Sequence, residues 1–145
     1  MNYLLDTNML IALAWPSHVH HRLAQDWFKR NRRRGWSTCP IMQTGFVRIS
    51  ANPKFIDGAV SPGEAIALLR RVTKSKDHSF WADTLNITNE NEMLRTHLLG
   101  HRQVTDAYLL ALAISQKGKL ATLDGGIASL LPDAGLQTKH LEIIA

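Results

Sequence analysis

The chain has 145 residues, 45% of them hydrophobic and 20% charged, and its 17 Lys and Arg outnumber its 12 Asp and Glu to give a formal net charge of +5. This composition is typical of one globular domain large enough to bury a core, and we expect that domain to cover residues 1–145. No apolar stretch approaches the roughly 20 residues of a membrane span, the N-terminus lacks a signal-peptide pattern, and the single Cys39 excludes an intrachain disulfide. These features predict a cytoplasmic protein with no membrane segment.

Short apolar runs alternate with helical patterns along the whole chain. We expect strands at 2–5, 36–39, 78–82, 120–123 and 140–144. Helices are expected at 8–15, from 18 or 20 to near 35, from 40 to about 52, from 61 through 72, at 88–99 and at 104–117, with a short turn of helix at 127–131. Strands that alternate with helices predict an α/β fold, a three-layer α/β/α sandwich with a central, mostly parallel sheet.

Two of these helices have strong sequence signals at their ends. Ser61 and Glu64 have the spacing of a capping box, and Pro62 suits the first helical position. The helix over 104–117 is apolar on most sides and is therefore expected to be buried, with Gly118 at its C-cap.

Three aspartates stand where such a fold would bring them together. Asp6 and Asp124 each end an apolar strand, and Asp106 opens the apolar helix. The carboxyl ends of parallel strands lie on one edge of the sheet, where ligands of open α/β sheets bind. Carboxylates gathered there repel one another unless a cation neutralises them, and hard oxygen ligands suit Mg²⁺ or Mn²⁺. The pattern predicts a metal-dependent enzyme.

Each aspartate also has a structural interpretation. Asp6 suits a helix N-cap, and Asp124 begins an Asp-Gly turn. Asp106 is harder to explain in this way, because an acid on the packed side of a helix is costly unless it is paired or bound to metal. The three together favour function.

The positive charge is concentrated in two clusters. The first comprises Lys29, Arg30, Arg32, Arg33 and Arg34, and the second comprises Arg70, Arg71, Lys74 and Lys76. Basic surfaces bind polyanions such as nucleic acid, although cations also favour solvated helix C-termini. A basic surface beside a carboxylate site is a more specific combination than either feature alone.

Histidines and tryptophans are interpreted mainly as structural residues. His18, His20 and His21 lack a second His/Cys cluster, so they favour a helix start over a zinc site. Core or subunit packing is favoured over base stacking for the four tryptophans, Trp15, Trp27, Trp36 and Trp81. His101 and Arg102 precede the Asp106 helix and are candidates for contact with the phosphates of a nucleic acid.

The motifs around the aspartates resemble a known family over essentially the whole chain. They are Leu5-Asp6-Thr7-Asn8, then Thr105-Asp106-Ala107-Tyr108-Leu109 with Leu112-Ala113, and then Leu120-Ala121-Thr122-Leu123-Asp124. In this order and spacing they resemble the PIN-domain ribonucleases, specifically the VapC toxins of VapBC toxin–antitoxin modules. The segment at 39–48 resembles the subgroup abundant in mycobacteria.

The resemblance implies a metal-dependent endoribonuclease that hydrolyses RNA phosphodiester bonds, in targets that include transfer and ribosomal RNA. It implies a homodimer inhibited by a VapB-type antitoxin, whose C-terminal segment packs over the active-site groove. The family holds Mg²⁺ or Mn²⁺ with four acids. Asp6, Asp106 and Asp124 match three of them, and Gln43 stands at the fourth, where it adds no charge. Three short polar neighbours are candidates to orient the carboxylates, namely Thr7, Asn8 and Thr122.

Two alternatives stay open. Gln43 makes a catalytically weak PIN-like RNA-binding module plausible. A phosphoryl-transfer or phospho-receiver domain also gathers aspartates at strand ends, but it would want paired acids near the first strand, and Asp6 has no acidic neighbour.

Overall fold

The computed structural model describes residues 2–88 and 100–145 and contains a five-stranded parallel sheet in the order β3-β2-β1-β4-β5. Its strands are β1 (Tyr3–Leu5), β2 (Trp36–Thr38), β3 (His78–Phe80), β4 (Lys119–Thr122) and β5 (Leu141–Ile143). All four pairings between neighbours are parallel, so the predicted parallel sheet is confirmed.

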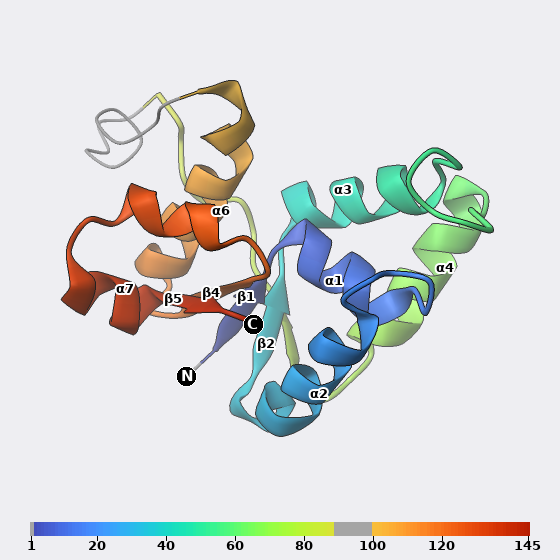
Figure 1. The fold of residues 1–145 in the computed structure, drawn as a ribbon, viewed down its shortest axis with the longest axis horizontal. Helices are drawn as coiled ribbons and strands as arrows, with labels where there is room; N and C mark the ends of the chain where they lie inside the picture. Colours follow the sequence, from blue (N-terminus) through green and yellow to red (C-terminus); the bar gives the residue numbers. More distant parts are fainter. Residues whose placement is uncertain (1, 89–99) are drawn as a thin grey trace.

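Helices cover both faces of the sheet and confirm the three-layer α/β/α sandwich (Figure 1). One face carries α1 (Thr7–Ala14), α2 (His21–Asn31), α3 (Pro40–Ser50) and α4 (Pro62–Thr73). The other face carries α6 (Val104–Ser115) and α7 (Ala134–His140). Within the described residues, 3₁₀ segments also occur at η1 (Arg32–Arg34), η2 (His101–Gln103) and η3 (Gly125–Leu130).

The direction of winding reverses between the two central strands. The chain leaves β1 into α1 on one face, and it leaves β4 through η3 toward α7 on the other face. These strands are neighbours, with Leu5 opposite Ala121. In open α/β sheets the crevice outside the carboxyl ends of two such strands is where ligands bind. Asp6 directly follows β1, and Asp124 lies two residues beyond the end of β4.

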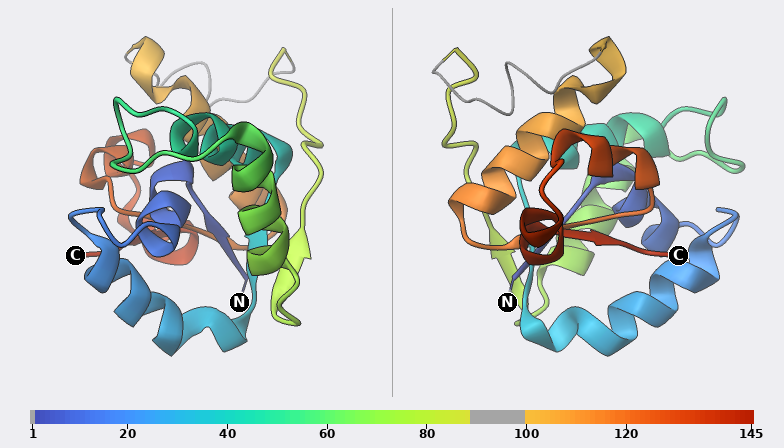
Figure 2. Two further views of the ribbon diagram at one scale, coloured as in Figure 1. Left: turned by 90° about the vertical axis from the view of Figure 1, so that its right-hand side faces the viewer. Right: turned by 60° about the vertical axis from the view of Figure 1, so that its left-hand side comes forward.

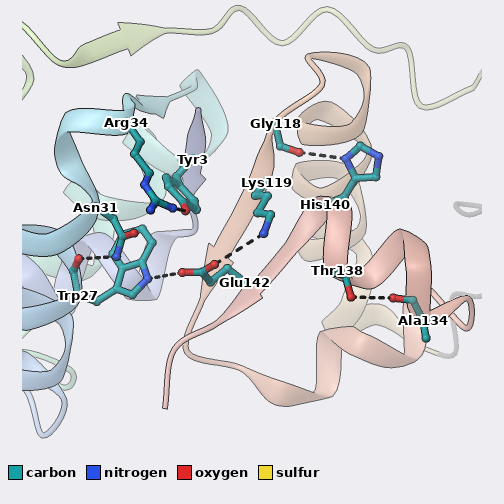
Figure 3. Close-up of polar contacts among 10 residues, drawn as sticks. All are labelled: Tyr3, Trp27, Asn31, Arg34, Gly118, Lys119, Ala134, Thr138, His140 and Glu142. Atoms are coloured by element: carbon teal, nitrogen blue, oxygen red, sulfur yellow. Dashed lines mark hydrogen bonds and ion pairs between the residues drawn. The ribbon is translucent and has the colours of Figure 1, made fainter. Parts of the chain in front are cut away.

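The tryptophans pack in or against the core, as the sequence favoured. Trp27 and Trp36 are buried, while Trp15 and Trp81 are partly buried against the same cluster. The indole N–H of Trp27 donates to Glu142 in β5 at 2.6 Å, and the Nζ of Lys119 lies 3.8 Å from the same carboxylate (Figure 3). This contact ties α2 to the far edge of the sheet.

The helix and strand predictions hold in outline, with differences at the ends of elements. The prediction of a helix at 88–99 falls on residues outside the described ranges, apart from Thr88 in a turn. Residues 81 and 82 lie outside β3, because that edge strand ends at Phe80, and Leu123 lies outside β4. The sequence patterns did not predict α7, a seven-residue helix that begins where the side chain of Asp133 accepts from the N–H of Leu136 at 3.0 Å.

The prediction of Gly118 as the C-cap of α6 was wrong. The left-handed residue is Lys117, with φ of 57°, and the N–H of Gly118 reaches back to the carbonyl of Ala113 at 2.8 Å. This is a Schellman ending with glycine one position later than expected. Glycine is needed there for space, because a Cβ would lie 2.6 Å from the carbonyl oxygen of Asn2.

Across the described residues, none of the helices has both the length and the apolar character to cross a membrane.

Candidate active site

Asp6 lies at the junction of β1 and α1 and makes two hydrogen bonds with its carboxylate. Its side chain is buried, with a residue exposure of 4%. One oxygen, Oδ1, accepts from the backbone N–H of Met9 at 2.7 Å, which is the N-cap contact expected of an aspartate. The other, Oδ2, accepts from the hydroxyl of Thr122 at 2.5 Å. Asp6 therefore caps α1 and also faces the end of β4.

Burial makes the Asp6 carboxyl hard to ionise. Loss of solvation is the main cause that raises its pKa from 3.8 to about 6, while the bonds from Thr122 and Met9 oppose that rise. The negative charges of Asp106 and Asp124 raise the pKa further. The three predicted acids therefore interact electrostatically across the crevice.

Thr122 links two of these acids through one hydroxyl group. Its Oγ donates to Asp6 and accepts from the backbone N–H of Asp124 at 3.0 Å. The Asp124 side chain is exposed and accepts from the N–H of Gly126 at 2.8 Å, at the start of η3. Thr122 therefore fixes both the direction of the Asp6 carboxylate and the path of the chain into Asp124.

Asp106 occupies the first turn of α6 and is partly buried. Burial is again the main cause that raises its pKa, and the charge of Asp124 adds to it. These two aspartates line one small pocket of about 120 Å³, together with Gln103, Gly126, Ile127 and Leu130. Gln103 was not predicted from the sequence, although its position three residues before Asp106 indicates the same helix face.

The chemistry of these donors fits a hard divalent cation. Three carboxylates gather at the crevice, and among the described side chains, which do not include that of Arg102, no Lys or Arg forms an ion pair with any of them. Their mutual repulsion and the burial of Asp6 would both be relieved by a cation. In the same described ranges, however, no three His, Cys, Asp or Glu side chains form a ready cage for a metal ion. In its described part the site is an acidic crevice without a paired cation.

Comparison with known proteins identifies the family of the chain. The model of the PIN domain family matches residues 3–130. The chain belongs to the PIN-domain family.

Relatives of this PIN domain include several curated proteins of Mycobacterium tuberculosis. It is 43% identical over 128 residues to "Ribonuclease VapC39", covering 88% of the chain and 92% of the relative. It is 41% identical over 141 residues to "Ribonuclease VapC44", covering 97% and 98%. The resemblance to VapC-type PIN domains is confirmed.

A solved structure supports the fold. A chain in the crystal structure of VapBC2 from Rickettsia felis, bound to a DNA fragment from the VapBC2 promoter, superposes with a TM-score of 0.67 over 100% of both chains. At 12% identity this similarity concerns the fold alone.

Gln43 makes its side-chain hydrogen bond with a residue of β2 and not with one of the three acids, among the residues that the structure describes. Its side-chain N–H donates to the hydroxyl of Thr38 at 3.0 Å, and that hydroxyl lies 2.7 Å from His78 Nε2. Gln43 also lines a second, mostly apolar pocket between α3 and α4. Within the described residues, no hydrogen bond joins Gln43 to an aspartate. Its assignment to the fourth acidic position stays a prediction.

The other predicted polar residues differ in their placement. Thr7 packs so closely on α3 that a Cβ on Gly45 would meet its side chain at 3.0 Å. Asn8 and His101 are exposed, and the side chain of Arg102 is outside the described part of the PIN domain. Among Thr7, Asn8 and Thr122, only Thr122 is hydrogen-bonded to an aspartate side chain in that part.

The three histidines lie at the start of α2, as favoured. His18 Nδ1 accepts from the N–H of His20 at 3.0 Å, and His21 Nδ1 lies 2.7 Å from the carbonyl oxygen of Ala12. These contacts shape the turn between α1 and α2.

The expectation of a basic surface beside the carboxylates was wrong. The first cluster ends one residue short of β2, and the second ends one residue short of β3. Because the strands are parallel, both clusters lie at the amino end of the sheet, opposite the aspartates (Figure 2). The amino end of the sheet therefore carries the two basic clusters, and the carboxyl end of the sheet carries the three aspartates.

Proposed function

We propose that this PIN domain is a metal-dependent endoribonuclease and the toxin of a type II toxin–antitoxin pair. The observation that carries the proposal is the buried Asp6, electrostatically coupled to Asp106 and Asp124 at the crevice between β1 and β4. The names of its relatives, which are 40–43% identical over most of the chain, support RNA as the substrate.

The three aspartates would hold the metal, with Mg²⁺ or Mn²⁺ as the ion that their oxygen donors favour. When bound, such an ion supplies Lewis acidity to phosphate oxygens and lowers the pKa of water. Thr122 orients the Asp6 carboxylate, and the N–H of Met9 fixes its second oxygen. Ile127 and Leu130 provide an apolar wall beside Asp106 and Asp124, which limits water around the reacting phosphate.

The partners follow from the same assignment. We propose a VapB-type antitoxin as inhibitor, a homodimer as the functional form, and transfer or ribosomal RNA as the target. The similar fold from Rickettsia felis comes from a VapBC2 structure, which supports an antitoxin partner. The single cysteine, which is buried and free, suits a reducing cytoplasm.

A direct assay tests the activity. Purified protein is incubated with RNA in EDTA, Mg²⁺ or Mn²⁺, beside Asp6→Ala and Asp106→Ala controls. Mapping of RNA 5′ ends after brief expression then identifies the cleaved site in cells. New ends that depend on Asp6 and on metal are expected. The proposal fails if the ends are the same for the intact chain and for Asp6→Ala.

An RNA-binding module is the second candidate, and the placement of Gln43 favours it. An amide bonded to Thr38 brings no fourth carboxylate to the crevice. RNA binding without any metal-dependent cleavage would support this candidate over the nuclease.

A further inference from the structure

The two basic clusters form one surface at the amino end of the sheet. Arg32 Nε in η1 lies 3.6 Å from Asp77 Oδ2, in the turn between α4 and β3. The backbone also joins there, because the N–H of Trp36 donates to the carbonyl of Asp77 at 3.0 Å. The end of α2 with η1 and the end of α4 therefore lie side by side (Figure 2). We call this surface the basic edge.

Nine exposed cations make up the basic edge, and Asp77 is the acid among them. They are Lys29, Arg30, Arg32, Arg33, Arg34, Arg70, Arg71, Lys74 and Lys76. Arg34 donates to the hydroxyl of Tyr3 at 3.4 Å (Figure 3), and Arg32 lies over the ring of Phe28 and pairs with Asp77. Within the part of the chain that is described, the other seven side chains form no ion pair or hydrogen bond. Their charge is available to a partner.

Helix electrostatics account for only part of this charge. Cations near a helix C-terminus are each stabilised by about 0.3–1 kcal/mol, an effect confined to the last turn. The three consecutive arginines of η1 place more positive charge there than this stabilisation of a helix C-terminus explains. The large exposed hydrophobic side chains of the described residues all lie outside 29–36 and 70–77. An apolar pocket between α2 and α4, lined by Phe28, Lys29 and Val72 among others, borders the edge, but the other cations of the edge do not line it. A surface on which exposed cations outnumber exposed apolar side chains suits a phosphate backbone better than an acidic protein, whose interface would bury aromatic or aliphatic groups.

One RNA molecule can reach both ends of the domain. Trp36, two residues after the end of η1, is level with Tyr3 in the sheet, and Asp6 lies three residues after Tyr3, just beyond β1. At about 3.3 Å per strand residue, this is about 10 Å along the sheet. In a double helix each strand carries one phosphate per about 3.4 Å of axis, so about ten nucleotides extend roughly 34 Å, which exceeds this separation along the sheet.

We propose that the basic edge is a second RNA-binding surface, which holds the phosphate backbone of the substrate away from the point of cleavage. This inference rests on the proposed function, because it takes RNA as the substrate. The contacts are sequence-independent, so the edge adds affinity for longer RNA while the acidic crevice selects the bond.

The test measures RNA binding without cleavage, in EDTA and in an Asp6→Asn background. The double variant Arg33→Gln with Arg70→Gln removes two unpaired charges of the edge. The matched control, Arg48→Gln with Lys54→Gln, removes two exposed charges elsewhere. Fluorescence anisotropy gives the Kd for a hairpin RNA of about 30 nucleotides, which is long enough to reach both ends of the sheet. Thermal melting confirms that all variants are folded.

For the edge variant we expect the slope of log K against log salt for the hairpin to become shallower by about 1.4, with binding weaker by about tenfold or more. The control variant should be nearly unaffected. If the edge variant and the control variant lost the same RNA affinity and the same salt slope, the effect would come from net charge alone, and that result would overturn the proposal. So would an unchanged slope, or a wild type that binds a polyglutamate peptide more tightly than RNA.

The two proposals fail separately. A protein that binds RNA through the edge but cleaves nothing in Mg²⁺ or Mn²⁺ contradicts the nuclease and leaves the edge intact. Metal-dependent cleavage with an unchanged salt slope contradicts only the edge.

Discussion

The two ends of the sheet treat charge in opposite ways. At the carboxyl end, Asp6 is buried and Asp106 partly buried, and hydrogen bonds position Asp6 and Asp124. At the amino end, nine cations are exposed and seven have no partner among the described residues. A buried carboxylate resists ionisation and is geometrically fixed, which suits chemistry at one atom. Exposed, mobile cations suit contact with a repeating backbone whose position varies.

This polarity follows from the parallel α/β architecture. Helices that return antiparallel to the strands place their C-termini at the amino end of the sheet, where cations are favoured. Their N-termini meet the carboxyl ends of the strands, where acids are favoured. Asp6 caps α1, Asp106 lies in the first turn of α6, and Asp124 caps η3. The fold therefore separates the proposed site of cleavage from the proposed surface for RNA binding.

The largest expected effect is the loss of cleavage in Asp6→Ala. Loss of a carboxylate that holds the metal costs several kcal/mol of transition-state stabilisation, so kcat/KM should fall by about 10³-fold or more. Asp26→Ala, which removes an exposed acid of α2, should retain activity. Cleavage of a labelled RNA in Mg²⁺ measures both. Normal turnover by Asp6→Ala would contradict a role in cleavage for the aspartates at the carboxyl end of the sheet.

Thr122→Val tests whether the hydroxyl at the end of β4 positions the carboxylates. The variant keeps the shape of the side chain but loses the bonds to Asp6 and to the N–H of Asp124. We expect activity to fall by about 10–100-fold, as for other groups that orient metal ligands. Thr122→Ser should restore most of it. Equal loss in the serine variant would indicate a packing role instead.

Asp6→Asn should stabilise the metal-free protein. The folded pKa of Asp6 is raised to about 6, so its favourable contribution is complete below pH 3.8 and is lost as pH rises through about 6. The shift corresponds to about 3 kcal/mol at pH 8, and we expect about 2 after one hydrogen bond weakens. Thermal melting in EDTA should give a higher Tm for Asp6→Asn at pH 8 and nearly equal values at pH 4. Added Mg²⁺ should raise the Tm of the wild type only. A lower Tm for Asp6→Asn at pH 8 would contradict the burial argument.

The smallest effect is expected for one charge of the basic edge. Arg33→Gln removes one unpaired, exposed cation and should make the salt slope shallower by about 0.7, with RNA binding a few-fold weaker. Its Tm should stay within about 1–2 °C of the wild type, because surface substitutions rarely exceed 0.5 kcal/mol. Lys54→Gln is the matched control. A large loss of Tm would indicate that Arg33 is structural.

The acidic end could be predicted from sequence because it depends on local patterns. Asp6 and Asp124 each follow a short apolar run, and parallel strands bring such ends together. The partner of the Thr122 hydroxyl could not be read from sequence, because Thr122 and Asp6 are 116 positions apart. The basic clusters were expected at the wrong end of the sheet, because their composition does not show at which end of the strands they lie. Helix α7 was missed because it has only seven residues and too little periodicity to stand out.

The backbone at Asn2 has a practical consequence for every experiment above. Its carbonyl accepts from the N–H of Lys119 at 3.0 Å, and its side chain accepts from the hydroxyl of Ser37 at 2.5 Å. An affinity tag attached before this residue would extend from the domain next to the basic edge. A polyhistidine tag would bring its own charge to the surface under test. A tag after the exposed Ala145 avoids that position. RNA affinities should therefore be compared in C-terminally tagged or tag-free protein.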